Sequence, residues 1–226
     1  MKYTCLLAFI ACCFSGCVST ALPQIVIPER SGEFNMGLSL PNIGVQADAQ
    51  YAIRKALVVG GAYNYSYGPG PIQYGEARLG SVLSGGSNMV TAAFGHGKFD
   101  LNLGFPTGGL DNSVDRYYGH FHKASLSWNH QHKFPKGVFG FICQLAYYQG
   151  TGNGVCSDTY CYTDFYNERF TGPASLQALM YLRLGQDQSL LLAVGGALSM
   201  NTKRSASIGG PAFFPSPSLV SVGFSM

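Results

Sequence analysis

The chain has 226 residues and a formal net charge of +3, and only 11% of its residues are charged while 46% are hydrophobic. A soluble domain is normally about a quarter charged, so this deficit argues against a surface that is wholly exposed to water. The weak positive charge gives no indication of nucleic-acid binding. Beyond the N-terminus no apolar run reaches the length of a membrane-spanning helix, which leaves strands as the elements that would contact lipid.

Residues 1–16 have the pattern of a secretory signal. Lys2 supplies a positive charge, residues 6–14 form an apolar core, and small residues precede Cys17. This order matches a bacterial lipobox, in which the cysteine becomes the acylated first residue of the mature chain. We therefore predict lipidation, by palmitate or a similar acyl chain, at Cys17, with a plain signal cleaved elsewhere as the alternative.

Residues 17–32 contain two prolines and no sustained alternation, so we predict a lipidated tether there and one domain over residues 33–226. Cys156 and Cys161 bracket a four-residue insert in a loop-like segment. Export to an oxidising compartment would permit a disulfide between them. Such a short loop contributes little chain entropy, so the bridge would shape a loop and leave the fold to other forces.

Strand patterns recur along the rest of the chain, at residues 33–40, 43–53, 56–67, 73–83, 89–103, 117–130, 138–149, 174–184, 190–200 and 219–226. In residues 56–67 one face runs from Leu57 to Tyr67 and is mostly apolar or aromatic, while the other face is small and partly polar. This pattern is typical of a transmembrane β-strand, with an apolar face toward lipid and tyrosines at the membrane interface.

The polar faces of these strands carry the charged residues Asp48, Glu76, Arg78, Arg183 and, as a further candidate, Lys123. Charges toward lipid would be costly, so we predict that these side chains lie in the lumen. Gly60 and Ala62 are small enough to leave room for longer side chains from the neighbouring strand. The mixture of both signs favours a filled, salt-bridged interior over an open pore, because about eight strands already give an interior that side chains fill.

Connections at residues 54, 85, 135 and 186 read as short turns, whereas those after residues 67, 103, 149 and 200 read as long, including an irregular segment at 150–173. Outer-membrane barrels have short periplasmic turns and longer outer loops. We predict an all-β, antiparallel transmembrane β-barrel of about ten strands, with eight as the fallback and both termini on the periplasmic side. The alternative is a soluble β-sandwich or lipocalin-like fold, whose outer face should be polar.

Several segments also carry a family resemblance, namely FSGC, GEFNMGLSLPNIGVQADAQYAI, RKALVVGGAYNYS, ARLGSVL, MVTAAFGHGKFD and RYYGHFHKASLSW. Together they resemble the outer-membrane barrel lipoproteins of Bacteroides-group bacteria. The resemblance implies a Gram-negative outer-membrane location and a barrel architecture, and it supplies no catalytic residues. The residues after Cys17 lack the acidic side chains of surface-exported lipoproteins in that group, which favours an anchor facing the periplasm.

Histidines are the candidate metal ligands of this sequence. His120 and His122 share a strand face, as do His130 and His132, and imidazole suits zinc, copper and nickel. The two pairs are too far apart for one site, His96 stands apart from both, and no carboxylate or thiolate is spaced to complete either pair. We therefore predict no metal site and no cofactor, and interpret the histidines as interface residues.

A membrane enzyme would need a nucleophile, a base and an orienting carboxylate near one another. Ser125, Ser127 and His130 share a strand and Asp115 and Asp164 lie in loops, but the sequence has no G-x-S-x-G motif. We predict a non-enzymatic outer-membrane barrel lipoprotein, an accessory or structural subunit of a membrane complex whose partners are the lipid bilayer and another outer-membrane protein. The alternatives are a narrow channel and a lipid-modifying membrane enzyme.

Overall fold

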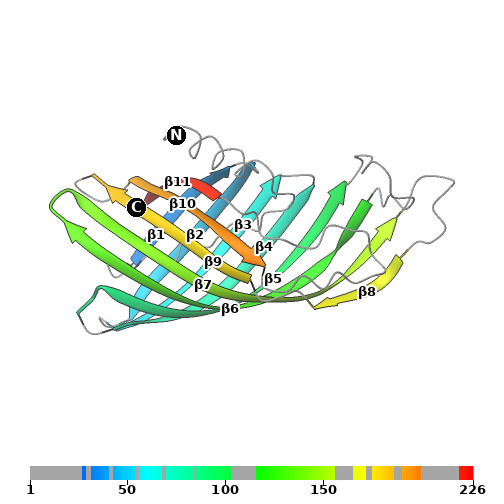
Figure 1. Cartoon of the computed structure of the whole chain (residues 1–226), viewed down its shortest axis with the longest axis horizontal. Helices are drawn as coiled ribbons and strands as arrows, with labels where there is room; N and C mark the ends of the chain where they lie inside the picture. The colour runs from blue at the N-terminus through cyan, green and yellow to red at the C-terminus, as the bar shows by residue number, and fades with distance from the viewer. Residues whose placement is uncertain are drawn as a thin grey trace, which may run out of the picture.

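A computed structural model describes residues 27–28, 32–40, 43–53, 56–67, 70–83, 85–102, 116–155, 165–171, 175–185, 190–199 and 219–225. This part of the chain is built of strands (Figure 1): β1 (Gly32–Leu40), β2 (Ile43–Ile53), β3 (Leu57–Tyr67), β4 (Pro71–Val82), β5 (Asn88–Asn102), β6 (Arg116–Phe134), β7 (Gly137–Val155), β8 (Phe165–Thr171), β9 (Ser175–Leu184), β10 (Leu190–Ser199) and β11 (Leu219–Ser225). None of the described residues belongs to a helix long and apolar enough to cross a membrane.

The strands form one antiparallel sheet that closes on itself. Each strand from β1 to β7 pairs with the next, β7 pairs with β9, and β10 and β11 complete the circuit back to β1, which makes a ring of ten strands. The additional strand β8 pairs with the end of β7 beyond the part that β9 covers. The prediction of an all-β antiparallel barrel of about ten strands is confirmed, and the β6–β7 pairing joins the two strands that would be the edges of an open sheet.

Two predictions about the connections are wrong. β7 continues to Val155 and β8 occupies Phe165–Thr171, so much of the segment predicted to be irregular is paired strand. The connection after Tyr67 is short because β4 already begins at Pro71. A proline is tolerated as the first residue of a strand, where its missing N–H breaks no ladder hydrogen bond.

The short turns use glycines where the backbone requires them. Gly85 and Gly86, between β4 and β5, have φ angles of 92° and 69°, and Gly185 at the end of β9 has 102°. These are left-handed conformations that side chains disfavour. The predicted turn at residues 85–88 therefore has a specific chemical basis.

Alternation along the strands separates an outward apolar face from an inward face. In β3 the outward Leu57 and Tyr63 are 41% and 51% exposed, whereas the inward Val58 and Asn64 are 5% and 6% exposed. Other strands repeat this pattern, and their large exposed apolar side chains include Val45, Leu79, Phe94, Leu126, Trp128, Phe139, Leu145, Tyr147, Met180 and Leu192. A surface of this kind is stable in lipid and is the reverse of what a soluble barrel presents to water.

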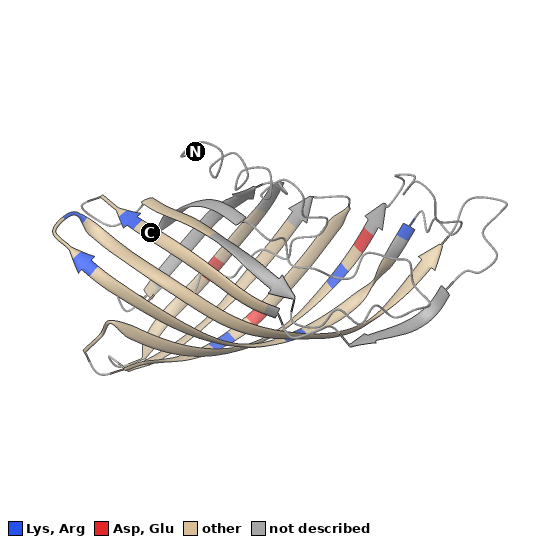
Figure 2. Cartoon of the chain, in the orientation of Figure 1, with Lys and Arg blue, Asp and Glu red and all other residues tan. Residues whose placement is uncertain are grey.

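The inward side chains form layers along the barrel. Near the short turns lies an apolar layer that draws residues from five strands and from the segment before β1, and its members are Ile27, Val58, Met89, Val138, Ile142, Leu179, Tyr181, Leu191 and Ala193. Farther from the short turns lies a layer of charged and amide side chains. Farther still lie the stacked rings of Tyr74 and Phe121, with Phe99 and Tyr148 beside them. Figure 2 shows how few charged residues the strands carry.

Candidate functional site

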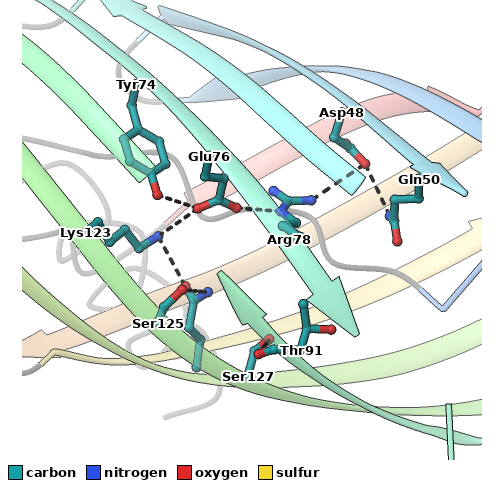
Figure 3. Close-up of polar contacts among 10 residues, drawn as sticks. Asp48, Gln50, Tyr74, Glu76, Arg78, Thr91, Lys123, Ser125 and Ser127 are labelled. Atoms are coloured by element: carbon teal, nitrogen blue, oxygen red, sulfur yellow. Dashed lines mark hydrogen bonds and ion pairs between the residues drawn. The ribbon is translucent and has the colours of Figure 1, made fainter. Parts of the chain in front are cut away.

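The centre of the barrel holds a network of buried charges around Glu76 (Figure 3). Glu76 on β4 lies opposite Gly95 on β5, and Gly95 in turn lies opposite Lys123 on β6. Because Gly95 has no side chain, the carboxylate and the ammonium group meet above it, with Lys123 Nζ 3.8 Å from Glu76 Oε2. A residue without a side chain thus allows an ion pair between two strands that are not neighbours.

Glu76 has two further partners on its own strand. Tyr74 donates its hydroxyl proton to Glu76 Oε2 at 2.5 Å, and Arg78 Nε donates to Glu76 Oε1 at 2.5 Å. Arg78 Nη1 also lies 3.9 Å from Asp48 Oδ2 on β2, and Gln50 donates to the same carboxylate at 3.3 Å. Within this network, opposite charges are therefore arranged so that each of Asp48, Glu76, Arg78 and Lys123 lies near a charge of the other sign.

Small residues make room for this network. Gly60 and Ala62 on β3 lie directly opposite Arg78 and Glu76, the neighbours that their size was predicted to accommodate. At Gly95 an added Cβ would collide with the Tyr74 ring and the backbone of Gly75. The barrel wall is therefore recessed where the long polar side chains lie.

The predicted site residues differ in where they lie. Asp48, Glu76 and Arg78 come together in the network, whereas the buried Arg183 lies near the short turns, opposite Val138. Lys123, weighed in the sequence as a further candidate, supplies the second cation and makes cation–π contacts with Tyr74 and Tyr148. The proposed lipidation site Cys17 and the proposed disulfide partners Cys156 and Cys161 lie outside the described residues.

Amide and hydroxyl side chains continue the network toward the short turns. Gln144 Nε2 donates to Ser125 Oγ at 3.0 Å, and its Oε1 lies 3.5 Å from Lys123 Nζ. Lower in the barrel, the Tyr181 hydroxyl donates to Asn129 Oδ1 at 3.1 Å. The Tyr181–Asn129 contact joins β9 to β6, the two strands that flank β7, so it passes over β7 as the Lys123–Glu76 pair passes over β5.

The serines and histidine of β6 do not form a catalytic group. Ser127 faces the lumen and donates to the backbone carbonyl of Thr91 at 3.3 Å, whereas His130 faces outward and bonds to Asn88 Oδ1 at 3.0 Å. A strand places residues three apart on opposite faces, so the hydroxyl and the imidazole cannot meet.

On the outer wall the structure brings His96, which the sequence left apart, next to the pair His120 and His122. His96 on β5 lies opposite His122 on β6, with ring centroids 4.8 Å apart, and His120 is 6.1 Å from His96. The register across the β5–β6 connection would have been needed to predict this contact. Within the described part of the chain, no group of three or more His, Cys, Asp or Glu is arranged to hold a metal ion.

Next to these histidines an open groove of about 780 Å³ lies on the outer wall of β4–β7. Asp100 on its margin accepts two hydrogen bonds from Arg116, at 2.7 and 2.6 Å. These hydrogen bonds and the positive charge of Arg116 hold the pKa of the Asp100 carboxyl below its usual value. Lys98 also borders the groove and is exposed.

Comparisons with solved structures give alignments of low TM-score, and the two comparisons of sequence find no match. No protein-family model matches the sequence, and no curated protein matches it. A KdgM porin aligns with a TM-score of 0.37 and 8% identity over 86% of this chain and 96% of that chain. CdiB from Acinetobacter baumannii aligns with a TM-score of 0.30 and 7% identity over 87% and 60% of the respective chains. The interpretation of this chain as a transmembrane barrel rests on its own closed sheet and outward apolar face.

Proposed function

We propose that the chain is a non-enzymatic lipoprotein barrel of the outer membrane that serves as an accessory or structural subunit of a membrane protein complex. The observation that carries the proposal is the filled interior. Among the described residues, an apolar layer from β3, β5, β7, β9, β10 and the segment before β1 lies below a charge network, so side chains occupy the lumen at both levels. With its lumen occupied by side chains, such a barrel has its outer wall and its loops left as working surfaces.

The outer wall supports the same proposal. It carries large apolar side chains around the ring, including aromatic residues at positions such as Tyr51, Tyr63, Trp128 and Tyr147. Such a wall meets lipid over most of its area and can also pack against another barrel, because aromatic residues are the usual anchors of interfaces. The lipid on Cys17 that we predict would hold the chain at the same membrane.

The partner can be tested by mild-detergent purification of the full chain from native membranes, followed by mass spectrometry. We expect one large outer-membrane protein to be recovered reproducibly in amounts comparable to this chain. Cys17→Ala is the matched variant for the anchor, and it should lose labelling by a radioactive fatty acid. Recovery of the chain alone contradicts the complex, and continued labelling of the variant contradicts the lipidation.

A narrow channel is the second candidate, and the polar side chains at the centre of the lumen are the observation that favours it. Planar-bilayer recordings on the purified barrel distinguish the two functions. We expect no discrete conductance steps from the wild-type chain. Reproducible single-channel steps would replace the structural function with a transport function.

A further inference from the structure

We propose that the groove on the outer wall of β4–β7 binds the phosphorylated headgroup of a glycolipid in the outer leaflet. This inference rests on the outer-membrane placement proposed above. The groove is bordered by Gln73, His96, Lys98, Asp100, Tyr118 and His120. Its volume of about 780 Å³ lies in the range of small-molecule sites and exceeds what a single phosphate fills.

The charge of the groove is suited to an anion. Lys98 lies opposite His120, and the next outward pair toward the short turns is His96 opposite His122. Asp100, the carboxylate at the margin, already accepts one hydrogen bond on each oxygen, from Nε and Nη2 of Arg116. The ring nitrogens of His120 lie 3.3 and 3.1 Å from the Thr151 hydroxyl. Lys98 Nζ and the His96 imidazole therefore remain as donors for a phosphate, and charge-assisted bonds of this kind are stronger than neutral ones.

The groove lies where the apolar wall ends. Phe94, one outward position closer to the short turns than His96, is 60% exposed and stacks on His122 with centroids 5.8 Å apart. Continuing in the same direction, the outward residues of β6 are Ala124, Leu126 and Trp128. Acyl chains can follow this apolar strip while a phosphate reaches Lys98 and the histidines.

The position of the groove along the barrel indicates which leaflet of the membrane it faces. β5 begins at the short turn of residues 85–87 and β6 ends at the short turn of residues 135–136, so both turns lie at one end of the barrel and the groove lies at the other. With short turns on the periplasmic side, that end meets the outer leaflet. Gln73 and Tyr118 add neutral polar groups at the margin that suit the hydroxyls of a saccharide.

Binding can be measured with the purified full chain in detergent, with three probes: a diphosphorylated lipid A, its dephosphorylated form, and inorganic phosphate. We expect the diphosphorylated lipid to bind most tightly. The double variant Lys98→Gln with His96→Gln should weaken it about tenfold, as expected for losing charge-assisted hydrogen bonds. Lys136→Gln, in the turn at the opposite end, is the matched control and should bind as the wild type does.

Three results would overturn the site. If the dephosphorylated lipid binds equally well, the cations of the groove do not bind a phosphate. If the double variant binds as tightly as the wild type, Lys98 and His96 do not form the site. If inorganic phosphate binds as tightly as the lipid, the groove is a site for a free anion. A phosphatidylglycerol vesicle that competes equally well would identify a phospholipid and contradict the glycolipid. None of these readouts depends on a protein partner, so failure of the complex and failure of the site remain distinguishable.

Discussion

Two lysines show how differently the inside and the outside of this barrel use charge. Lys123 is 1% exposed and lies between a carboxylate, an amide and two aromatic rings. Lys98, on the neighbouring strand but the opposite face, is exposed and borders an open groove. The buried cation is satisfied by the protein and helps to close the lumen, whereas the exposed cation is available to a ligand.

The largest expected effect comes from removing the central carboxylate. Glu76→Gln leaves the buried Lys123 without its counter-charge and the buried Arg78 with Asp48 alone, which should cost about 3–5 kcal/mol of folding free energy. Urea titration in lipid vesicles can follow this through the fluorescence of Trp128, since the chain has 1 tryptophan.

A second substitution tests whether the stability lost in Glu76→Gln comes from the broken ion pair with Lys123. Lys123→Met added to Glu76→Gln removes the cation that lost its partner, so the double variant should be more stable than the sum of the two single effects predicts. Strict additivity would mean that the two side chains do not interact.

The membrane wall gives the next largest effect. Leu126, outward and in the middle of β6, is 55% exposed, so Leu126→Lys would cost little if this surface met water. In lipid the same change should cost about 2–4 kcal/mol. His132→Lys, outward on the same strand but close to the short turn, is the control and should cost much less; equal stability of the two variants would contradict a lipid-facing wall.

A smaller effect should follow from filling a recess in the wall. The Tyr181 ring lies against Gly140, and a Cβ there would collide with it. Gly140→Ala should displace the ring, weaken its hydrogen bond to Asn129 and cost about 1–3 kcal/mol. Gly75→Ala is the matched control because the nearest atom to its Cβ would be 3.9 Å away; a larger loss at Gly75 would refute the explanation.

The smallest effect concerns the exposed Asp100–Arg116 pair. Because the folded-state pKa of Asp100 is lowered, its stabilisation is present above the unfolded pKa of about 3.9 and is lost as the pH falls through the folded value. Wild type should thus lose a small stability advantage over Asp100→Asn below about pH 4. An advantage that persists at pH 2 would show that the ion pair is not its source.

Strand identity could be predicted from sequence where one face of a strand is apolar and the other is polar or small. In β3 and β4 the period of two separates Leu57 and Leu79 from Asn64 and Glu76, and the structure follows it. β8 was missed because aromatic residues occur at neighbouring positions, as in Phe165 and Tyr166, which gives no alternation. β8 is a strand in the structure because it pairs with residues 149–154 of β7, a contact that its own sequence does not indicate.

The candidate sites depended on register, which a single sequence does not supply. Glu76 could be assigned to the lumen, but its contact with Lys123 requires the alignment of β4, β5 and β6 and the absence of a side chain at Gly95. The approach of His96 to His122 depends on the same alignment. Both are contacts between segments joined by turns or loops whose length does not determine register.

Ile27 in the apolar layer limits where the proposed acyl chain can lie. Its side chain is 3% exposed among residues of the barrel interior, so Ile27 itself is fixed at the mouth near the short turns. Cys17 precedes it by 10 residues, and a chain of that length spans at most about 35 Å. A lipid on Cys17 would therefore enter the bilayer beside this barrel, among the first lipids around its wall.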